Sequence, residues 1–497
     1  MTALSAGAPP NSFTWSSTLL DRARKEVRRL QVRIAKAIQV GRWGKVKALQ
    51  RLLTRSFHAK LLAVQRVSSN KGRRTPGVDG VLWNSPSAKV RAVLSLRSRA
   101  YKPLPLRRIY IPKKNGKKRP LSIPTMFDRA MQALHKLALA PVAESTADPN
   151  SYGFREGRSC ADAIAAAFID LANRNSATWI LEADIQGCFD NISHQWLLDN
   201  IPMEKQPLKA WLQAGYVEGG LAFPTRKGAP QGGLISPTLA NMTLDGLEAA
   251  VHAAVPRRSR VNFVRYADDL IVTGKSRAIL ETNVRPAIEA FLAERGLALN
   301  PEKTFVTHIR SGFTFLGQTL RKAGRSIRIV PSKQAVQSLL QRVGTIIRKH
   351  VSAPPQALIA NLNRVLRGWA NFHRHVVSTL TFRHIDHVVF QNLWRMLRRR
   401  HPGKGTTWLL REYWSAAGPG AIFSARYRDA KGQIKVSRLV HLAEIPIVRH
   451  IKIRATANPY LPEYAAYFWR RRHHAGTKQF GARELEQHRA KLSRPRG

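Results

Sequence analysis

The stretch that decides the fold is Val261–Gly274, which reads VNFVRYADDLIVTG. Apolar residues run on both sides of Tyr266–Asp269, and they predict a strand, a tight turn and a second strand with Asp268 and Asp269 at the tip. Upstream, Trp179–Asp190 reads WILEADIQGCFD, an apolar strand that ends at Asp184. If the two strand ends lie side by side, three carboxylates share one small volume.

Three carboxylates so close together predict a cation site. Like charges repel one another unless cations bind between them. Hard oxygen ligands of this kind suit Mg²⁺. Two such ions can activate an attacking hydroxyl and stabilise a leaving pyrophosphate in line. The alternative is that Asp268 and Asp269 only form a polar turn, and the pair alone does not exclude it.

The charge of the chain points to nucleic acid. Its 497 residues include 83 Lys and Arg but only 30 Asp and Glu, a formal net charge of +53. Such an excess needs a polyanionic partner, and nucleic acid provides one because each neutralised phosphate releases counterions. Ribosomal and histone-like proteins are also basic but are usually much shorter. The length and the 44% of hydrophobic residues predict about two to four folded domains.

Cysteine content and hydropathy restrict the environment. Cys160 and Cys188 are the only cysteines in the sequence, which excludes a disulfide framework and a zinc site made of two Cys pairs. No stretch approaches the roughly 18 uninterrupted apolar residues of a membrane span. Met1–Pro10 lacks the pattern of a secretory signal. These features predict a reducing compartment that contains nucleic acid, without membrane attachment.

The apolar spacing changes along the chain. It is helical from Leu20, with basic residues between the apolar ones, and residues 107–124 read as a basic β-hairpin. Short strands then alternate with helices up to about residue 320, an α+β pattern. After Pro331 three amphipathic stripes predict a helical bundle. From about residue 411 the chain is basic, aromatic and irregular in pattern.

Several motifs together resemble the group II intron-encoded reverse transcriptases, also called maturases. The Tyr-Ala-Asp-Asp box is shared by many reverse transcriptases. The segments that match in order are KGRRTPGVDG (71–80), SYGFREGRS (151–159), KGAPQGGLISPTLAN (227–241), GLALNPEKT (296–304), FTFLG (313–317) and LRGWANFHRHV (366–376). The first and last of these are similar to the intron-encoded subfamily specifically, and the resemblance extends from about residue 15 to about residue 470.

The resemblance implies an α+β fold of the right-hand polymerase type. It implies an N-terminal helical extension and the start of the fingers over residues 1–80, and fingers and palm over residues 81–325. An α-helical thumb, the maturase domain, would follow over residues 326–410. Residues 411–497 would form a basic DNA-binding region, and because no cysteine follows Cys188 its endonuclease would be absent or vestigial.

The resemblance also implies roles for single residues. Asp184 and Asp268 would ligate two Mg²⁺ ions, with Asp269 assisting. Lys113 and Arg119 would grip the triphosphate of the incoming dNTP, unless they only form a solvated basic hairpin.

Two further side chains are expected at the nucleotide. Gln231 would contact its sugar or base, although a turn-stabilising amide is nearly as good an interpretation. Phe189, five residues after Asp184, would exclude a 2′-hydroxyl, the alternative being a core phenylalanine.

In the helical segment, Arg364, Arg367 and Arg374 would contact intron RNA, His373 and His375 are further candidates, and Trp369 is expected in the core.

The function that follows is that of an RNA-directed DNA polymerase encoded by a group II intron. It would bind intron RNA to assist splicing and copy that RNA into DNA during retrohoming into target DNA. A homodimer is left open, as is an organelle in place of a bacterial cytoplasm with association to the nucleoid. Two other functions stay open at this stage: an RNA chaperone with an idle polymerase site, and a reverse transcriptase domesticated for repair or defence.

Overall fold

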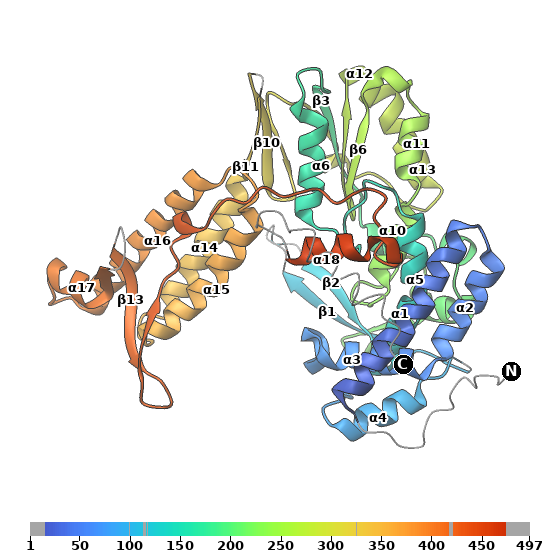
Figure 1. The fold of residues 1–497 in the computed structure, drawn as a ribbon, viewed down its shortest axis with the longest axis horizontal. Helices are drawn as coiled ribbons and strands as arrows, with labels where there is room; N and C mark the ends of the chain where they lie inside the picture. Colours follow the sequence, from blue (N-terminus) through green and yellow to red (C-terminus); the bar gives the residue numbers. More distant parts are fainter. Residues whose placement is uncertain are drawn as a thin grey trace.

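The computed structural model describes residues 15–473, apart from residues 99, 113–115, 117, 325 and 417–420. A main body carries two four-stranded sheets, and a helical bundle stands beside it (Figure 1). None of the helices within the described ranges combines the length and the apolar character needed to cross a bilayer.

The N-terminal helices pack on one long central helix. These are α1 (Ser17–Gln39), α2 (Trp43–Arg55) and α3 (Phe57–Ser69), and the central helix is α5 (Met126–Thr146). Helix α4 (Pro86–Ser95) packs on α3. The Ser16 side chain caps α1 by accepting a hydrogen bond from the backbone nitrogen of Leu19. Ala23, Val27 and Ile34 form a buried stripe on α1, as the helical spacing predicts. The helical segment therefore extends to Ser95, past the expected end at residue 80.

The main sheet is antiparallel and has the strand order β6-β7-β3-β8. Its strands are β3 (Trp179–Asp184), β6 (Asn262–Tyr266), β7 (Asp269–Gly274) and β8 (Phe305–His308). Both faces are buried. Helix α6 (Cys160–Ala172) covers one face, and α11 (Leu247–Ala253) and α13 (Arg285–Ala293) cover the other (Figure 1). Burial on both faces explains why the strands of this sheet are almost continuously apolar.

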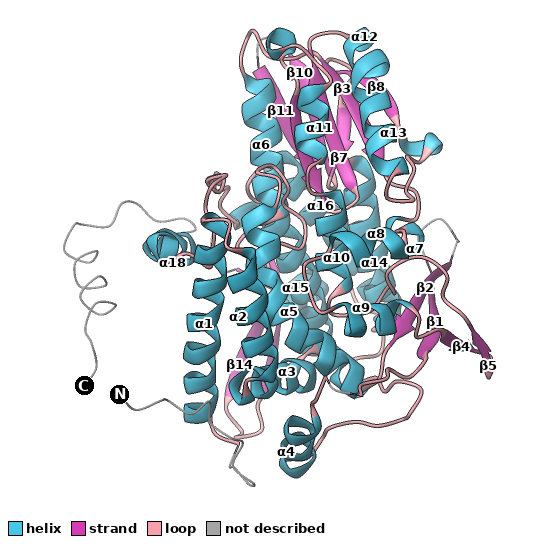
Figure 2. Cartoon of the chain, turned by 90° about the vertical axis from the view of Figure 1, so that its right-hand side faces the viewer, coloured by secondary structure: helices cyan, strands magenta, loops and turns pink. Residues whose placement is uncertain are grey.

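The predicted hairpin belongs to a second sheet, of order β2-β1-β4-β5. Strands β1 (Leu106–Pro112) and β2 (Lys118–Ile123) pair in register from Arg107 opposite Ile123 to Pro112 opposite Lys118. They are joined by β4 (Tyr216–Glu218) and β5 (Leu221–Phe223). Figure 2 shows this sheet standing out from the helical body. Short helices connect the two sheets: α7 (Cys188–Asn191), α8 (His194–Asn200), α9 (Lys205–Leu212) and α10 (Ser236–Leu244). Helix α12 (Arg277–Ile279) follows β7 and leads back to β8 within the main sheet.

The predicted bundle forms after a three-stranded sheet of β9 (Phe313–Phe315), β10 (Gln318–Ala323) and β11 (Ser326–Pro331). Its helices are α14 (Lys333–Lys349), α15 (Pro355–His373) and α16 (Thr379–Arg400), and they bury their own core. Residues expected in that core and found there include Val343, Leu362 and Val389. Trp369 packs against the same core.

The chain after residue 410 divides in a way that its pattern does not show. Helix α17 (Thr406–Tyr413) and strands β12 (Trp414–Ala416), β13 (Ala421–Arg428) and β14 (Ile434–Arg438) extend the bundle, whose core includes Trp414, Phe423 and Leu442. Ile453 and Ala457 instead belong to the core under the main sheet. The core of the bundle therefore continues past residue 410, where the sequence predicts a domain boundary.

Residues 446–473, including α18 (Ala465–His473), return to the main body and are fastened there by Asp162. This buried carboxylate accepts hydrogen bonds from His450 Nε2 and Arg471 Nη2, both at 2.9 Å, and from the backbone nitrogen of Ile453 at 2.7 Å. Burial would raise the pKa of Asp162, but the hydrogen bond and charge of His450 and the charge of Arg471 outweigh it and lower that pKa. A segment expected to be a separate DNA-binding region thus packs in part on the sheet.

Candidate active site

The Tyr266–Asp269 turn joins β6 to β7. Tyr266 and Asp269 form the last pair of the β6–β7 ladder, so only two residues lie in the loop. Ala267 has φ +59°, a left-handed conformation that residues other than glycine rarely adopt. Gly153 packs directly on the turn, because a Cβ there would lie 2.4 Å from the backbone nitrogen of Ala267. Close backbone packing therefore holds this strained turn in place.

A buried arginine supports the turn from behind. Arg265 is fully buried, and its Nη2 donates to Asp245 Oδ1 at 2.7 Å and lies 4.0 Å from Asp148 Oδ2. Its Nη1 donates to Asn241 Oδ1 at 3.3 Å, and Asn241 Nδ2 donates to the carbonyl of Gly153 at 2.7 Å. Burial raises the pKa of Asp245 to about 6, although the charge of Arg265 lowers it. One network thus links the strand that carries the turn to the loop that packs on it.

The sequence alone predicts no role for Arg265. The available signal was a charged residue inside an apolar strand, because a buried charge requires a partner. The partners at residues 148 and 245 come from distant parts of the chain and have no local signature.

The structure brings the three expected carboxylates together. Asp184 and Asp269 are direct partners in the β3–β7 ladder, and Asp268 precedes Asp269 in the turn. Burial raises the pKa of Asp269 to about 7, and the charges of Asp268 and Asp184 act in the same direction. Burial raises the pKa of Asp268 as well. The repulsion that the sequence predicts is therefore present in the folded chain.

Lys303 and Asn300, which the sequence analysis quoted without a role, contact Asp184. Lys303 Nζ donates to Asp184 Oδ2 at 2.8 Å and Asn300 Nδ2 donates to the same oxygen at 3.4 Å. The hydrogen bond to Asp184 raises the pKa of Lys303. With the side chains so placed, no three His, Cys, Asp or Glu residues of the described chain are arranged to hold a metal ion. The Lys303 side chain is 63% exposed, so its departure from Asp184 would not disturb the core.

Lys113 and Arg119 are the two cations expected at the triphosphate, and only Arg119 is among the described residues. Arg119 is exposed on β2, opposite Ile111. Burial raises the pKa of Asp268 and the charge of Arg119 opposes that shift, so the guanidinium lies within electrostatic reach of the carboxylates. Lys113 lies outside the described residues.

Phe189 and Gln231 line one cavity of about 210 Å³ between α7 and the β1–β2 sheet. Phe189 is half-buried: it packs against the main core and meets the ring of Phe154 edge-to-face, with 6.4 Å between centroids. One part of the Phe189 ring therefore belongs to the core, and another part faces the cavity, where the gate against a 2′-hydroxyl is expected. Gln231 Nε2 donates to Asp190 Oδ2 at 3.0 Å, and its backbone carbonyl accepts from the Ser122 nitrogen at 2.7 Å. The Gln231 amide thus has a turn-stabilising contact and also faces the cavity.

The bundle residues separate into exposed and buried ones. Arg364 and Arg367 are exposed and lie three residues apart on α15, so they share a face. Arg374 is half-buried at the C-cap of that helix, about two turns beyond Arg367. His373 is buried, and burial lowers its pKa to about 4, so it is not available as the phosphate contact that the sequence suggested.

Three family models match the chain in order. "N-terminal domain of reverse transcriptase" matches residues 15–96, "Reverse transcriptase (RNA-dependent DNA polymerase)" matches residues 111–320, and "Group II intron, maturase-specific domain" matches residues 336–414. The second match contains the whole carboxylate site, and the third covers the helical bundle.

Individual relatives agree with these matches. Protein YkfC of Escherichia coli K12 is 34% identical over 325 residues, which cover 56% of this chain and 84% of that protein. The group II intron-encoded protein LtrA of Lactococcus lactis is 30% identical over 328 residues, which cover 52% of this chain and 54% of LtrA. The matched region thus spans about half of LtrA. Among solved structures, telomerase from Candida albicans has a TM-score of 0.38 and 12% identity, with 60% of this chain and 56% of that chain covered.

The carboxylates at the strand ends, the ordered family matches and the share of YkfC that is covered lead to one conclusion. This chain belongs to the group II intron-encoded reverse transcriptases, RNA-directed DNA polymerases that carry a maturase domain.

Proposed function

We propose that Asp184, Asp268 and Asp269 hold two Mg²⁺ ions and form the centre at which this chain extends DNA on an RNA template. The observation that carries this proposal is the direct pairing of Asp184 with Asp269 beside the turn that bears Asp268. The donor set consists of oxygens only, and its excess negative charge is opposed by exposed cations that can move. When bound, the ions would supply the charge that activates a primer hydroxyl and stabilises the leaving pyrophosphate.

The arrangement of the elements supports a right-hand polymerase. In this proposal the β1–β2 sheet and the N-terminal helices are the fingers, the main sheet is the palm, and α14–α16 form the thumb. The main sheet fixes the carboxylates through backbone ladders and through the buried Arg265, so it acts as a rigid platform. Primer and template would lie between this platform and the bundle.

The incoming dNTP would lie at the cavity that Phe189 and Gln231 line. Arg119 on β2 would bind phosphate oxygens, a task that suits the forked guanidinium, and Lys113 is proposed for the same task. The exposed part of Phe189 would lie against the sugar and leave no room for a 2′-hydroxyl.

Replacing Phe189 by valine is expected to raise the use of ribonucleotides relative to deoxyribonucleotides by about tenfold or more, because the smaller side chain frees space beside the sugar. The measurement is the ratio of kcat/KM for dCTP and CTP on a primed RNA template. An unchanged ratio would assign Phe189 to the core alone. Phe263→Val, which shortens a buried phenylalanine on β6, controls for a general loss of stability.

Intron RNA and target DNA are the proposed nucleic acid partners. The similarity to LtrA, described as a group II intron-encoded protein, supports an RNA of that kind and a role in its splicing and retrohoming. Arg364 and Arg367 present an exposed cationic face, and Arg374 lies near the segment that returns to the palm. The basic helix α18 lies in the proposed DNA-binding region, residues 411–497, of which the structure describes residues 411–416 and 421–473.

Replacing Arg364, Arg367 and Arg374 together by alanine is expected to weaken intron RNA binding and flatten its salt dependence. At about 0.7 per phosphate contact on single strands, the slope of log affinity against log salt should fall by about 2. Filter binding over a range of salt concentrations measures both quantities.

A second triple variant controls for net charge, because it removes three exposed arginines elsewhere: Arg257→Ala, Arg258→Ala and Arg277→Ala. Equal effects from both triple variants would show that the α15 face has no special part in RNA binding.

The proposed function is tested by primer extension with purified protein, a primed RNA template, dNTPs and Mg²⁺. A DNA product that requires both Mg²⁺ and dNTPs is expected. RNA binding without any extension at saturating Mg²⁺ would favour the RNA chaperone with an idle site.

A further inference from the structure

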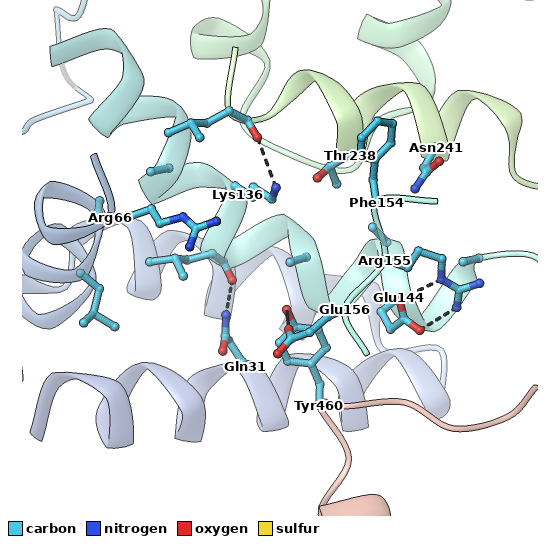
Figure 3. A pocket seen from close by; sticks show the side chains of 18 of the residues that line it. Gln31, Arg66, Lys136, Glu144, Phe154, Arg155, Glu156, Thr238, Asn241 and Tyr460 are labelled. Carbon is cyan, nitrogen blue, oxygen red and sulfur yellow. Dashed lines mark hydrogen bonds and ion pairs between the residues drawn. The ribbon is translucent and has the colours of Figure 1, made fainter. Parts of the chain in front are cut away.

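A second cavity, of about 690 Å³, lies among α1, α3, α5, α10 and the segment that carries Tyr460 (Figure 3). Pockets of about 300–1,000 Å³ are the size that encloses small ligands. The wall mixes apolar side chains such as Leu62 and Leu137 with polar ones such as Thr238 and Gln65. None of the three catalytic carboxylates is among its lining residues. The cavity therefore has no part in the reaction proposed above.

The acidic groups on the wall already have partners. Glu144 accepts hydrogen bonds from Arg155 Nε and Nη2, at 2.9 and 2.6 Å (Figure 3). Glu156 Oε2 accepts from the Tyr460 hydroxyl at 3.0 Å. The third acid, Asp245, pairs with Arg265. Glu144 and Asp245 thus have arginine partners, whereas Glu156 accepts its hydrogen bond from a neutral hydroxyl.

Two cations on the wall are not compensated in this way. Arg66 on α3 has no hydrogen-bond or ion-pair partner among the described residues. Lys136 on α5 is half-buried, and its Nζ makes only a 3.3 Å hydrogen bond to the carbonyl of Leu234. Burial lowers the pKa of Lys136 and the charge of Arg66 lowers it further, while the charge of Glu156 opposes both. An anion that binds between Arg66 and Lys136 would offset the repulsion between their charges.

The wall also carries an aromatic ring in an unusual position. Phe154 has φ +57°, a strained backbone for a bulky residue, and its side chain is nonetheless 56% exposed. Its neighbour Arg155 is anchored by Glu144 and by the carbonyls of Asp148 and Ser151, which fixes the loop that carries the ring. An exposed aromatic face on a fixed loop is suited to stacking on an unpaired base.

We propose that this cavity binds one unpaired nucleotide of the RNA, with the base against Phe154 and the adjoining phosphate between Arg66 and Lys136. The Thr238 hydroxyl and the Glu156 carboxylate, which also line the wall, would offer hydrogen bonds to base edges. The inference rests on the proposed RNA binding of this chain but not on its polymerase activity. Because Phe154 contacts the ring of Phe189, the bound nucleotide would lie one side chain away from the dNTP cavity.

The test is equilibrium binding and crosslinking of an RNA oligonucleotide that carries 4-thiouridine. In Arg66→Gln and Lys136→Met, affinity for single-stranded RNA is expected to fall about fivefold to tenfold near 0.15 M salt. The slope of log affinity against log salt should fall by about 0.7 in each variant. The crosslink should map to the peptide that contains Phe154 and should be lost in Phe154→Ala.

Arg55→Gln and Lys45→Met are the matched controls, since both residues are exposed on α2 and do not line the cavity. Equal losses in controls and variants, or crosslinks that map away from Phe154, would overturn the proposal. If Lys136→Met does not fold, Arg66→Gln decides, because Arg66 is exposed. These readouts need no DNA synthesis, so a failure of the polymerase assay would leave this result unaffected.

A free nucleotide has the same base and phosphate groups as a nucleotide within RNA. A comparison with AMP shows which of the two occupies the cavity. Single-stranded RNA is expected to protect Lys136 from acetylation, whereas AMP at the same phosphate concentration is not. Equal protection by AMP would assign the cavity to a free nucleotide and contradict the proposal.

Discussion

Replacing Asp268 by asparagine is expected to lower the rate of DNA synthesis on a primed RNA template by about 10³-fold or more. The change keeps the size of the side chain but removes a negative charge from a group of three carboxylates. Metal-assisted stabilisation of transition-state charge is worth several kcal/mol, and about 4 kcal/mol corresponds to this factor. Single-turnover primer extension at saturating dNTP measures the effect.

Asp199→Asn is the matched control for this variant. Asp199 is exposed on α8 and accepts hydrogen bonds only from Gln195 among the described residues, so its charge lies on a helix surface. Synthesis by Asp199→Asn should match the wild type. If Asp268→Asn also kept a rate near that of the wild type, the assignment of the carboxylate site would be wrong.

The largest effect on stability is expected from Arg265→Met, at about 3–5 kcal/mol of the free energy of unfolding. The methionine fills a similar volume but leaves Asp245 buried opposite Asp148 without the guanidinium that compensates them. Breaking a buried ion pair by removing one partner costs about this much. Urea unfolding followed by circular dichroism measures it.

Arg285→Met provides the comparison. The Arg285 side chain on α13 is 43% exposed and pairs with Glu289 one turn away, an interaction worth about 0.5 kcal/mol or less. A similar small loss in both variants would show that the Arg265 network does not support the turn. A large loss in Arg265→Met with the expected small loss in Arg285→Met would agree with the structure.

Local patterns predicted the elements that carry the site. The mainly apolar runs on both sides of Tyr266–Asp269 predict a strand, a turn and a strand, and the structure has this arrangement. Helical spacing likewise predicted α1 and the three bundle helices, because one apolar stripe per helix has to be buried. The Asn-Gly turn between two short strands predicted the β1–β2 hairpin.

The features that could not be predicted depend on contacts between distant segments. Three such contacts join residues more than 100 positions apart in the sequence: Arg265 with Asp148, Lys303 with Asp184, and His450 with Asp162. His373 appeared as one of several cations in a short stretch, yet its helix turns it into the core. The strands between residues 414 and 438 are not predicted because β12 has only three residues and β14 only five, too few to show an alternating pattern among the basic residues.

The central claim is that one carboxylate site performs synthesis while other surfaces bind the RNA. The most direct test is a paired assay of Asp184→Asn, in which primer extension and protein-assisted splicing at low magnesium are measured with the same intron RNA. Asp184 lies at the end of β3, and neither Arg364 nor Arg367 contacts it among the interactions of the described residues. We expect extension to be lost and splicing assistance to stay at the level of the wild type. Equal loss of both activities would contradict the account, because synthesis and RNA binding would then share one site.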